Sequence, residues 1–225
     1  MNIKSNLQEI QKQIPPHVKL IAVSKTKPNE DILEAYHTGQ LMFGENKAQE
    51  LQLKYTQLSK DIQWHFIGHL QTNKIKYIAP FVHLIHSVDS FKLLVEIDKE
   101  AKKNDRIIDC LLQFYIATEE SKYGFDLDEA ELLLGSEIYF TLKNIRVVGV
   151  MGMATYTEDE QLIRTEFKQL KMYFDTLKTK YFANNDDFKE LSMGMTSDYH
   201  IAIQEGSTIV RIGSAIFGER DYKTN

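Results

Sequence analysis

The chain has few of the features that mark secreted, membrane or nucleic-acid-binding proteins. Its 225 residues include one cysteine, Cys110, so no intramolecular disulfide can form, and this fits a reducing compartment. No apolar run approaches the roughly 18 residues that span a bilayer, and residues 1–13 lack the apolar core of a signal peptide. The net charge of -5 argues against general nucleic-acid binding. We therefore expect a cytoplasmic protein with no membrane segment.

Short apolar runs alternate with stretches of helical periodicity along the whole chain. The apolar runs are of strand length, and several are rich in β-branched residues, which favours buried strands. Eight strands are predicted, at residues 18–23, 41–43, 63–67, 82–88, 107–116, 145–151, 191–195 and 209–212.

The stretches between these runs repeat apolar residues every three or four positions, as one face of a helix does. Asn29 and Asp126 are expected to cap two of the helices, another is expected at 71–78, and an initial helix at 3–14 precedes the first strand. The clearest stripe is Ile163, Phe167, Leu170, Phe174 and Leu177.

Strict alternation of strands and helices predicts a parallel sheet. Eight such units close naturally into a (β/α)₈ TIM-type barrel, here a single domain over residues 1–225 with an extra N-terminal helix. A doubly wound open sheet is the alternative.

Small and polar residues follow nearly every predicted strand. Lys25 follows the first, Asn46 the second, Thr196 the seventh, and Gly213 and Ser214 the eighth. The carboxyl ends of barrel strands meet at one face, where active sites are built, so a single pocket is predicted there.

The loops after the seventh and eighth strands indicate a phosphate site. Gly213 would let backbone N–H groups approach a ligand, and Thr196, Ser197 and Ser214 add hydroxyl groups near helix N-termini. Either loop alone would be an ordinary turn. Together they occupy the place where barrels recurrently bind phosphate.

Two cations stand out beside these loops. Lys25 emerges directly from an apolar strand, and partial desolvation would favour the neutral amine that a Schiff base requires. A solvated lysine is the alternative reading, and Lys27 is the nearby competitor. Arg211 lies inside the last apolar strand, so it needs either a structural ion pair or a contact to a cofactor.

A metal site is disfavoured by the histidine spacing. His65 and His69 span a strand end and a glycine and so do not share a helix face; His83 and His86 are the other close pair. Cys110 lies in an apolar strand and is expected in the core. Neither a P-loop nor a nucleophile elbow is present in the sequence.

Five motifs, in order and spread over the whole chain, resemble the YggS/PROSC family of pyridoxal phosphate homeostasis proteins. This family is similar in fold to the N-terminal barrel of alanine racemase. The motifs are IAVSKTKP at 21–28, FGEN at 43–46, WHFIGHLQTNK at 64–74, LSMGMTSD at 191–198 and VRIGSAIFG at 210–218.

The resemblance implies a monomer that binds pyridoxal 5′-phosphate (PLP), without established turnover. It would buffer PLP or deliver it to apo PLP-dependent enzymes and influence amino-acid and keto-acid balance. Thr196 stands where a serine is usual, but it keeps the hydroxyl. By motif, the implied contacts are Lys25 for the Schiff base, Asn46 near the ring, Arg211 at the pyridine nitrogen, and Ser192, Thr196, Gly213 and Ser214 around the phosphate.

Arg211 would disfavour protonation of the pyridine nitrogen and so weaken the ring as an electron sink. That suits a PLP holder, or a slow fold-type III racemase, better than a transaminase. The racemase carries a further β-domain that supplies a second base, and we expect none after Gly218. A barrel enzyme acting on another phosphate ligand, such as a sugar phosphate, is the remaining alternative.

Overall fold

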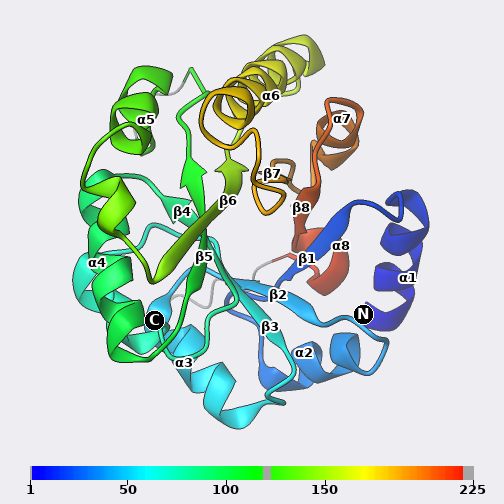
Figure 1. The fold of residues 1–225 in the computed structure, drawn as a ribbon. Coiled ribbons are helices and arrows are strands. Elements are labelled where there is room, and N and C mark those ends of the chain that lie inside the picture. The colour runs from blue at the N-terminus through cyan, green and yellow to red at the C-terminus, as the bar shows by residue number, and fades with distance from the viewer. Residues whose placement is uncertain (1, 119–122, 220–225) are drawn as a thin grey trace.

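Eight parallel strands close into a barrel in the computed structural model, which describes residues 2–118 and 123–219 (Figure 1). Each strand pairs with the next in sequence, and β8 pairs with β1 from Lys19↔Ile209 to Ala22↔Ile212. This closure confirms the barrel and excludes the open sheet. The strands are β1 Lys19–Val23, β2 Met42–Glu45, β3 Gln63–Phe66, β4 Leu84–Val88, β5 Ile108–Gln113, β6 Ile145–Met151, β7 Glu190–Ser192 and β8 Ile209–Ile212.

Helices form the outer layer around the strands, and the predicted N-terminal helix is present (Figure 1). They are α1 Ile3–Gln13, α2 Asn29–Tyr36, α3 Ala48–Gln57, α4 Phe91–Lys103, α5 Leu127–Leu134, α6 Glu160–Tyr181, α7 Tyr199–Gln204 and α8 Ser214–Phe217, with two 3₁₀ helices, η1 Thr72–Tyr77 and η2 Tyr139–Thr141. In the part of the chain that is described, no helix is both long and apolar enough to cross a membrane.

Local sequence signals explain where some helices begin. Asp126 caps α5 as predicted: its carboxylate accepts from Glu129 N at 2.8 Å, and the Glu129 side chain accepts from Asp126 N at 3.1 Å. The prediction for Asn29 was wrong, because Pro28 occupies the cap and Asn29 is the first helical residue. The Asn29 amide instead donates to Gln57 at 2.6 Å.

The helix predicted over 71–78 is a 3₁₀ helix. Ile75 and Ile78 are both fully buried and lie three residues apart, which matches the three-residue turn of this helix type. Strand ends also differ from the prediction. β2 extends through Gly44 and Glu45, and β7 stops at Ser192 because its pairing with β8 is confined to Ser192↔Ile209.

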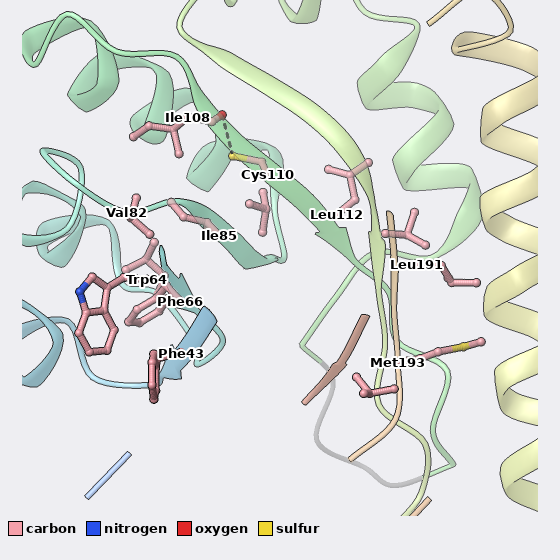
Figure 2. Packing of buried hydrophobic residues seen from close by; sticks show 14 of the residues in the cluster. Phe43, Trp64, Phe66, Val82, Ile85, Ile108, Cys110, Leu112, Leu191 and Met193 are labelled. Carbon is pink, nitrogen blue, oxygen red and sulfur yellow. Dashed lines mark hydrogen bonds between the residues drawn. The ribbon is translucent and has the colours of Figure 1, made fainter. Parts of the chain in front are cut away.

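Two apolar layers surround the strands. The outer layer fills the space between strands and helices, and Figure 2 shows Phe43, Trp64 and Phe66 in one part of it. Cys110 belongs to this layer, as predicted, and burial raises the pKa of its thiol above the usual value. The inner layer lies within the barrel and comprises Ile21, Leu84, Leu111, Val148, Met151 and Ile209.

Helix α8 packs against α1, so it joins the first and last elements of the described chain. α8 follows β8 directly, and at its contact with α1 (Figure 1) Asn6 Nδ2 donates to the Ile216 carbonyl at 3.1 Å. This contact fixes α8, and with it the end of the loop after β8, against the N-terminal helix.

Candidate functional site

The loops after β7 and β8 meet as predicted. Gly213 N donates to Thr196 Oγ1 at 3.3 Å, and Ser214 is exposed beside them. A Cβ on Gly213 would lie 3.2 Å from the Val23 carbonyl, so the β8 loop rests against the end of β1. α7 and α8 have six and four residues, and the predicted helix dipole is therefore small. Backbone N–H groups and hydroxyls remain as the donors for an anion.

Lys25 lies half-buried in the turn that follows β1. The next residue, Thr26, has a φ of 65°, in the left-handed region that β-branched residues rarely adopt. Two contacts fix this turn: Thr26 N donates to Glu50 Oε1 at 2.7 Å, and Lys54 Nζ donates to the Ser24 carbonyl at 2.9 Å. The backbone that carries Lys25 is therefore held from both sides.

A buried ionic cluster beneath this turn was not anticipated from the sequence. Lys54 Nζ lies 2.8 Å from both Glu45 Oε1 and Glu50 Oε1, and Ser24 Oγ donates to Glu45 at 2.5 Å. Burial raises the pKa of Glu45, against the opposing effect of Lys54. The available signal was Glu45 itself, a carboxylate directly after two apolar strand residues.

Lys27, the competing amine, has a structural role. Its Nζ donates to the backbone carbonyls of Phe217 at 2.8 Å and Glu219 at 2.9 Å, at the end of α8. These bonds tie the β1 loop to the end of α8.

Asn46, directly after β2, carries an unsatisfied polar atom. Gly68 packs tightly on it, because a Cβ at position 68 would lie 2.5 Å from the Asn46 carbonyl. The side-chain oxygen Oδ1 of Asn46 is buried and has no hydrogen-bond partner among the residues described. Leaving such a group unpaired costs about 1–3 kcal/mol, so a ligand or water that donates to Oδ1 would stabilise the folded protein.

Arg211 is buried inside the barrel and is held by uncharged groups. Its Nη1 donates to Ser192 Oγ at 2.5 Å and its Nη2 to the Gly152 carbonyl at 3.1 Å. Within residues 2–118 and 123–219 no carboxylate lies within 4.0 Å of it, so Arg211 forms no structural ion pair with the described residues. Burial lowers the pKa of Arg211 to about 10, which still leaves it charged at neutral pH.

Ser192 lies apart from the group formed by Thr196, Gly213 and Ser214. Its hydroxyl is fully buried and contacts Arg211 and, at 2.9 Å, His86 Nδ1. The contacts of Ser192 therefore support Arg211, whereas its predicted phosphate contact stays a prediction.

The histidines pair differently from their sequence spacing. His65 Nδ1 lies 2.9 Å from His86 Nε2, while His69 Nδ1 lies 2.9 Å from Asp89 Oδ2. The described residues contain no group of three or more histidine, cysteine or acidic side chains arranged to hold a metal ion.

Comparison with known proteins identifies the family. The family model for the alanine racemase N-terminal domain matches residues 1–221. A pyridoxal phosphate homeostasis protein of Aquifex aeolicus (strain VF5) is 43% identical over 205 residues, which cover 91% of this chain and 88% of that protein. The chain belongs to the pyridoxal phosphate homeostasis family. Its human member is 37% identical over 214 residues, covering 91% of this chain and 77% of the human protein.

Solved structures agree with this family assignment. PipY of Synechococcus elongatus PCC7942, 34% identical, covers 96% of this chain and all of its own, with TM-scores of 0.89 without PLP and 0.86 with PLP bound. An alanine racemase of Clostridium difficile 630 is 16% identical, with a TM-score of 0.74 over 99% of this chain and 57% of that one. That likeness shows the shared barrel fold.

Proposed function

We propose that this chain binds PLP as a Schiff base on Lys25 and serves in PLP homeostasis, with no catalytic turnover of its own. The proposal is supported by three features at the carboxyl ends of the strands: an amine, two hydroxyl groups beside a glycine loop, and a buried cation with no carboxylate within 4.0 Å among the described residues. The amine is on Lys25, the hydroxyls and the glycine loop are those of Thr196, Ser214 and Gly213, and the cation is Arg211.

The residues present fit the chemical parts of PLP. When bound, PLP supplies an aldehyde, which condenses with a lysine amine and releases water, and a ring that withdraws electrons. The two hydroxyls and the Gly213 loop suit its phosphate, and the unpaired Asn46 Oδ1 offers an acceptor beside the ring. Other relatives support the assignment, since those of Vibrio cholerae and Helicobacter pylori are also named pyridoxal phosphate homeostasis proteins.

Arg211 favours a protein that binds PLP without catalysing a reaction on it. A guanidinium whose partners among the described residues are uncharged disfavours a second positive charge on a nearby pyridine nitrogen, and an unprotonated ring is a weak electron sink. We further propose that the protein acts as a cytoplasmic monomer and hands PLP to apo PLP-dependent enzymes. Neither a nucleic acid nor a membrane is part of this proposal.

The test is reductive trapping. The protein loaded with PLP should be yellow, borohydride should remove the visible band, and mass spectrometry of peptides should place the adduct on Lys25. Lys25→Ala should abolish the band, whereas the matched variant Lys27→Ala should keep it. An adduct on Lys27 or Lys74 in the wild type would contradict the assignment.

A slow racemase is the second candidate, because the barrel is shared with alanine racemases. Incubation of the PLP-loaded protein with single enantiomers of several amino acids, followed by chiral chromatography, separates the two functions. We expect no enantiomer exchange above that of free PLP. Exchange that disappears in Lys25→Ala would establish the racemase.

A further inference from the structure

Four polar side chains form a continuous hydrogen-bonded chain across the interior of the barrel. They come from β3, β4, β7 and β8 and are His65, His86, Ser192 and Arg211. The steps are 2.9 Å from His65 Nδ1 to His86 Nε2, 2.9 Å from His86 Nδ1 to Ser192 Oγ, and 2.5 Å from Ser192 Oγ to Arg211 Nη1. All four residues are at most 4% exposed, so solvent cannot substitute for a missing partner.

The chain has a direction, which Arg211 sets. A guanidinium only donates, so the Ser192 oxygen accepts from it, and the Ser192 proton is left to donate to His86 Nδ1. His86 then carries its proton on Nε2 and donates it to His65 Nδ1. The proton of His65 lies on Nε2, which is buried without a hydrogen-bond partner in the described structure.

The opposite direction leaves more groups unsatisfied. If His65 donated to His86 and His86 to Ser192, the Ser192 proton would lack an acceptor, and His65 Nε2 would be a bare acceptor. Each buried unsatisfied group is costly, so the direction that starts at Arg211 is the more stable one.

Both imidazoles are neutral in this arrangement. Burial lowers the pKa of His65 and of His86 well below the usual range, and the charge of Arg211 adds to the effect on His86. Asp198 attracts Arg211 electrostatically and raises its pKa against the effect of burial; the Asp198 carboxylate accepts from Met195 N at 2.5 Å, and burial raises the pKa of Asp198. Arg211 is therefore anchored by uncharged groups, with no ion pair within 4.0 Å among the described residues.

We propose that His86, backed by His65, is the residue that positions Arg211 as a cation against the ring of the cofactor. The inference rests on the proposed function, because it takes PLP as the ligand. A serine hydroxyl can rotate and present its proton to many acceptors. The His86 acceptor fixes that rotation, so that the Ser192 lone pair faces Arg211, and His65 accepts the proton that His86 carries on Nε2.

Two substitutions at His86 separate positioning from packing. In His86→Asn the amide oxygen takes the place of Nδ1, so the acceptor for Ser192 is kept. In His86→Leu the acceptor is lost, while the site stays filled by an apolar side chain. The readout is the ¹⁵N chemical shift of the pyridine nitrogen of labelled PLP bound to each protein, measured against pH.

In the wild type and in His86→Asn the ring nitrogen should stay unprotonated from about pH 6 to pH 9, a window that brackets the ordinary histidine pKa. In His86→Leu its apparent pKa should rise by about one unit, and PLP should bind about fivefold more weakly, the size of one lost hydrogen bond. Wild-type behaviour in a folded His86→Leu protein would overturn the proposal.

A second measurement needs neither PLP nor a folded variant. In the ligand-free wild type, ¹⁵N spectra should show His65 and His86 protonated on Nε2, with no titration over the same pH range. Protonation of His86 on Nδ1 would overturn the proposal. If the wild type fails to bind PLP, the proposed function fails, and this tautomer pattern still decides whether Arg211 directs the chain.

Discussion

Replacing Lys54 with methionine tests whether the ionic cluster beneath the Lys25 turn holds that turn in place. Lys54 is 7% exposed and Glu45 is fully buried, so Lys54→Met leaves a buried carboxylate without its cation. Methionine fills the space of the lysine stem, which separates the loss of charge from the loss of packing.

The expected loss of stability is about 3 kcal/mol. The Lys54 ammonium makes three hydrogen bonds, to Glu45, Glu50 and the Ser24 carbonyl. Removing one member of a buried ion pair costs about 3–5 kcal/mol. We take the lower end, because Glu50 is partly exposed and Glu45 can escape its charge by taking up a proton.

The sign of the pH dependence follows from Glu45. Burial already raises its pKa in the wild type, and without Lys54 the pKa must rise further. A raised folded-state pKa stabilises the folded protein as the pH falls, by up to about 1.4 kcal/mol per pH unit. The loss caused by Lys54→Met should therefore be smaller at pH 5 than at pH 7.

Urea unfolding of the ligand-free protein at the two pH values measures both effects. The matched control is Lys99→Met, which breaks the exposed pair with Glu96 and should cost about 0.5 kcal/mol or less. The double variant Glu45→Gln with Lys54→Met should recover part of the loss. A loss below about 1 kcal/mol, or one that is equal at both pH values, would refute the reasoning.

Two further predictions concern the barrel interior and the phosphate loops. The pKa values of His65 and His86 are depressed in the folded state, so the unfolded chain binds protons first as the pH falls. The free energy of unfolding should therefore stay constant above about pH 6.5 and fall below it by up to about 1.4 kcal/mol per pH unit for each histidine. Urea unfolding at pH 7 and pH 5.5 should show a smaller fall in the double variant His65→Gln/His86→Asn. Thr196→Ala combined with Ser214→Ala should weaken PLP binding by about 1–3 kcal/mol. Fluorescence titration with PLP would measure this, and unchanged affinity would place the phosphate elsewhere.

The barrel was predictable because its signals are local. Each strand is a short apolar run and each helix has its own periodicity, so the order of elements follows without knowledge of long-range contacts. Boundaries were less accurate where pairing partners decide them, as at β7, whose pairing with β8 is confined to Ser192. The cap of α2 was misassigned because Pro28 satisfies the preference for an extended residue without a side-chain bond.

The candidate site also contains features with local sequence signals and features that depend on long-range contacts. The placement of Lys25, Thr196 and Gly213 after the carboxyl ends of their strands was predictable, because strand ends in a barrel converge on one face; their contacts to a ligand stay a prediction. The environment of Arg211 was not, because its two partners, Ser192 on β7 and Gly152 after β6, lie far from it in the sequence, and only the closed barrel brings them together. His65 and His86 were compared with sequence neighbours, whereas the contact that matters joins residues 21 positions apart.

The proposed ligand can bind only late in folding, because its binding residues come together when the barrel closes. The bond from Lys27 to the Phe217 carbonyl joins positions 190 residues apart, and β1 must find β8 before the Gly213 loop can rest on Val23. Contacts of such long sequence separation form slowly, because the chain must first lose the entropy of a large loop. A ligand that bridges Lys25 and the loop after β8 binds the closed barrel alone, and it raises the free energy of unfolding by about RT ln(1 + [L]/Kd). The concentration of free cofactor would then set the stability of the closed barrel.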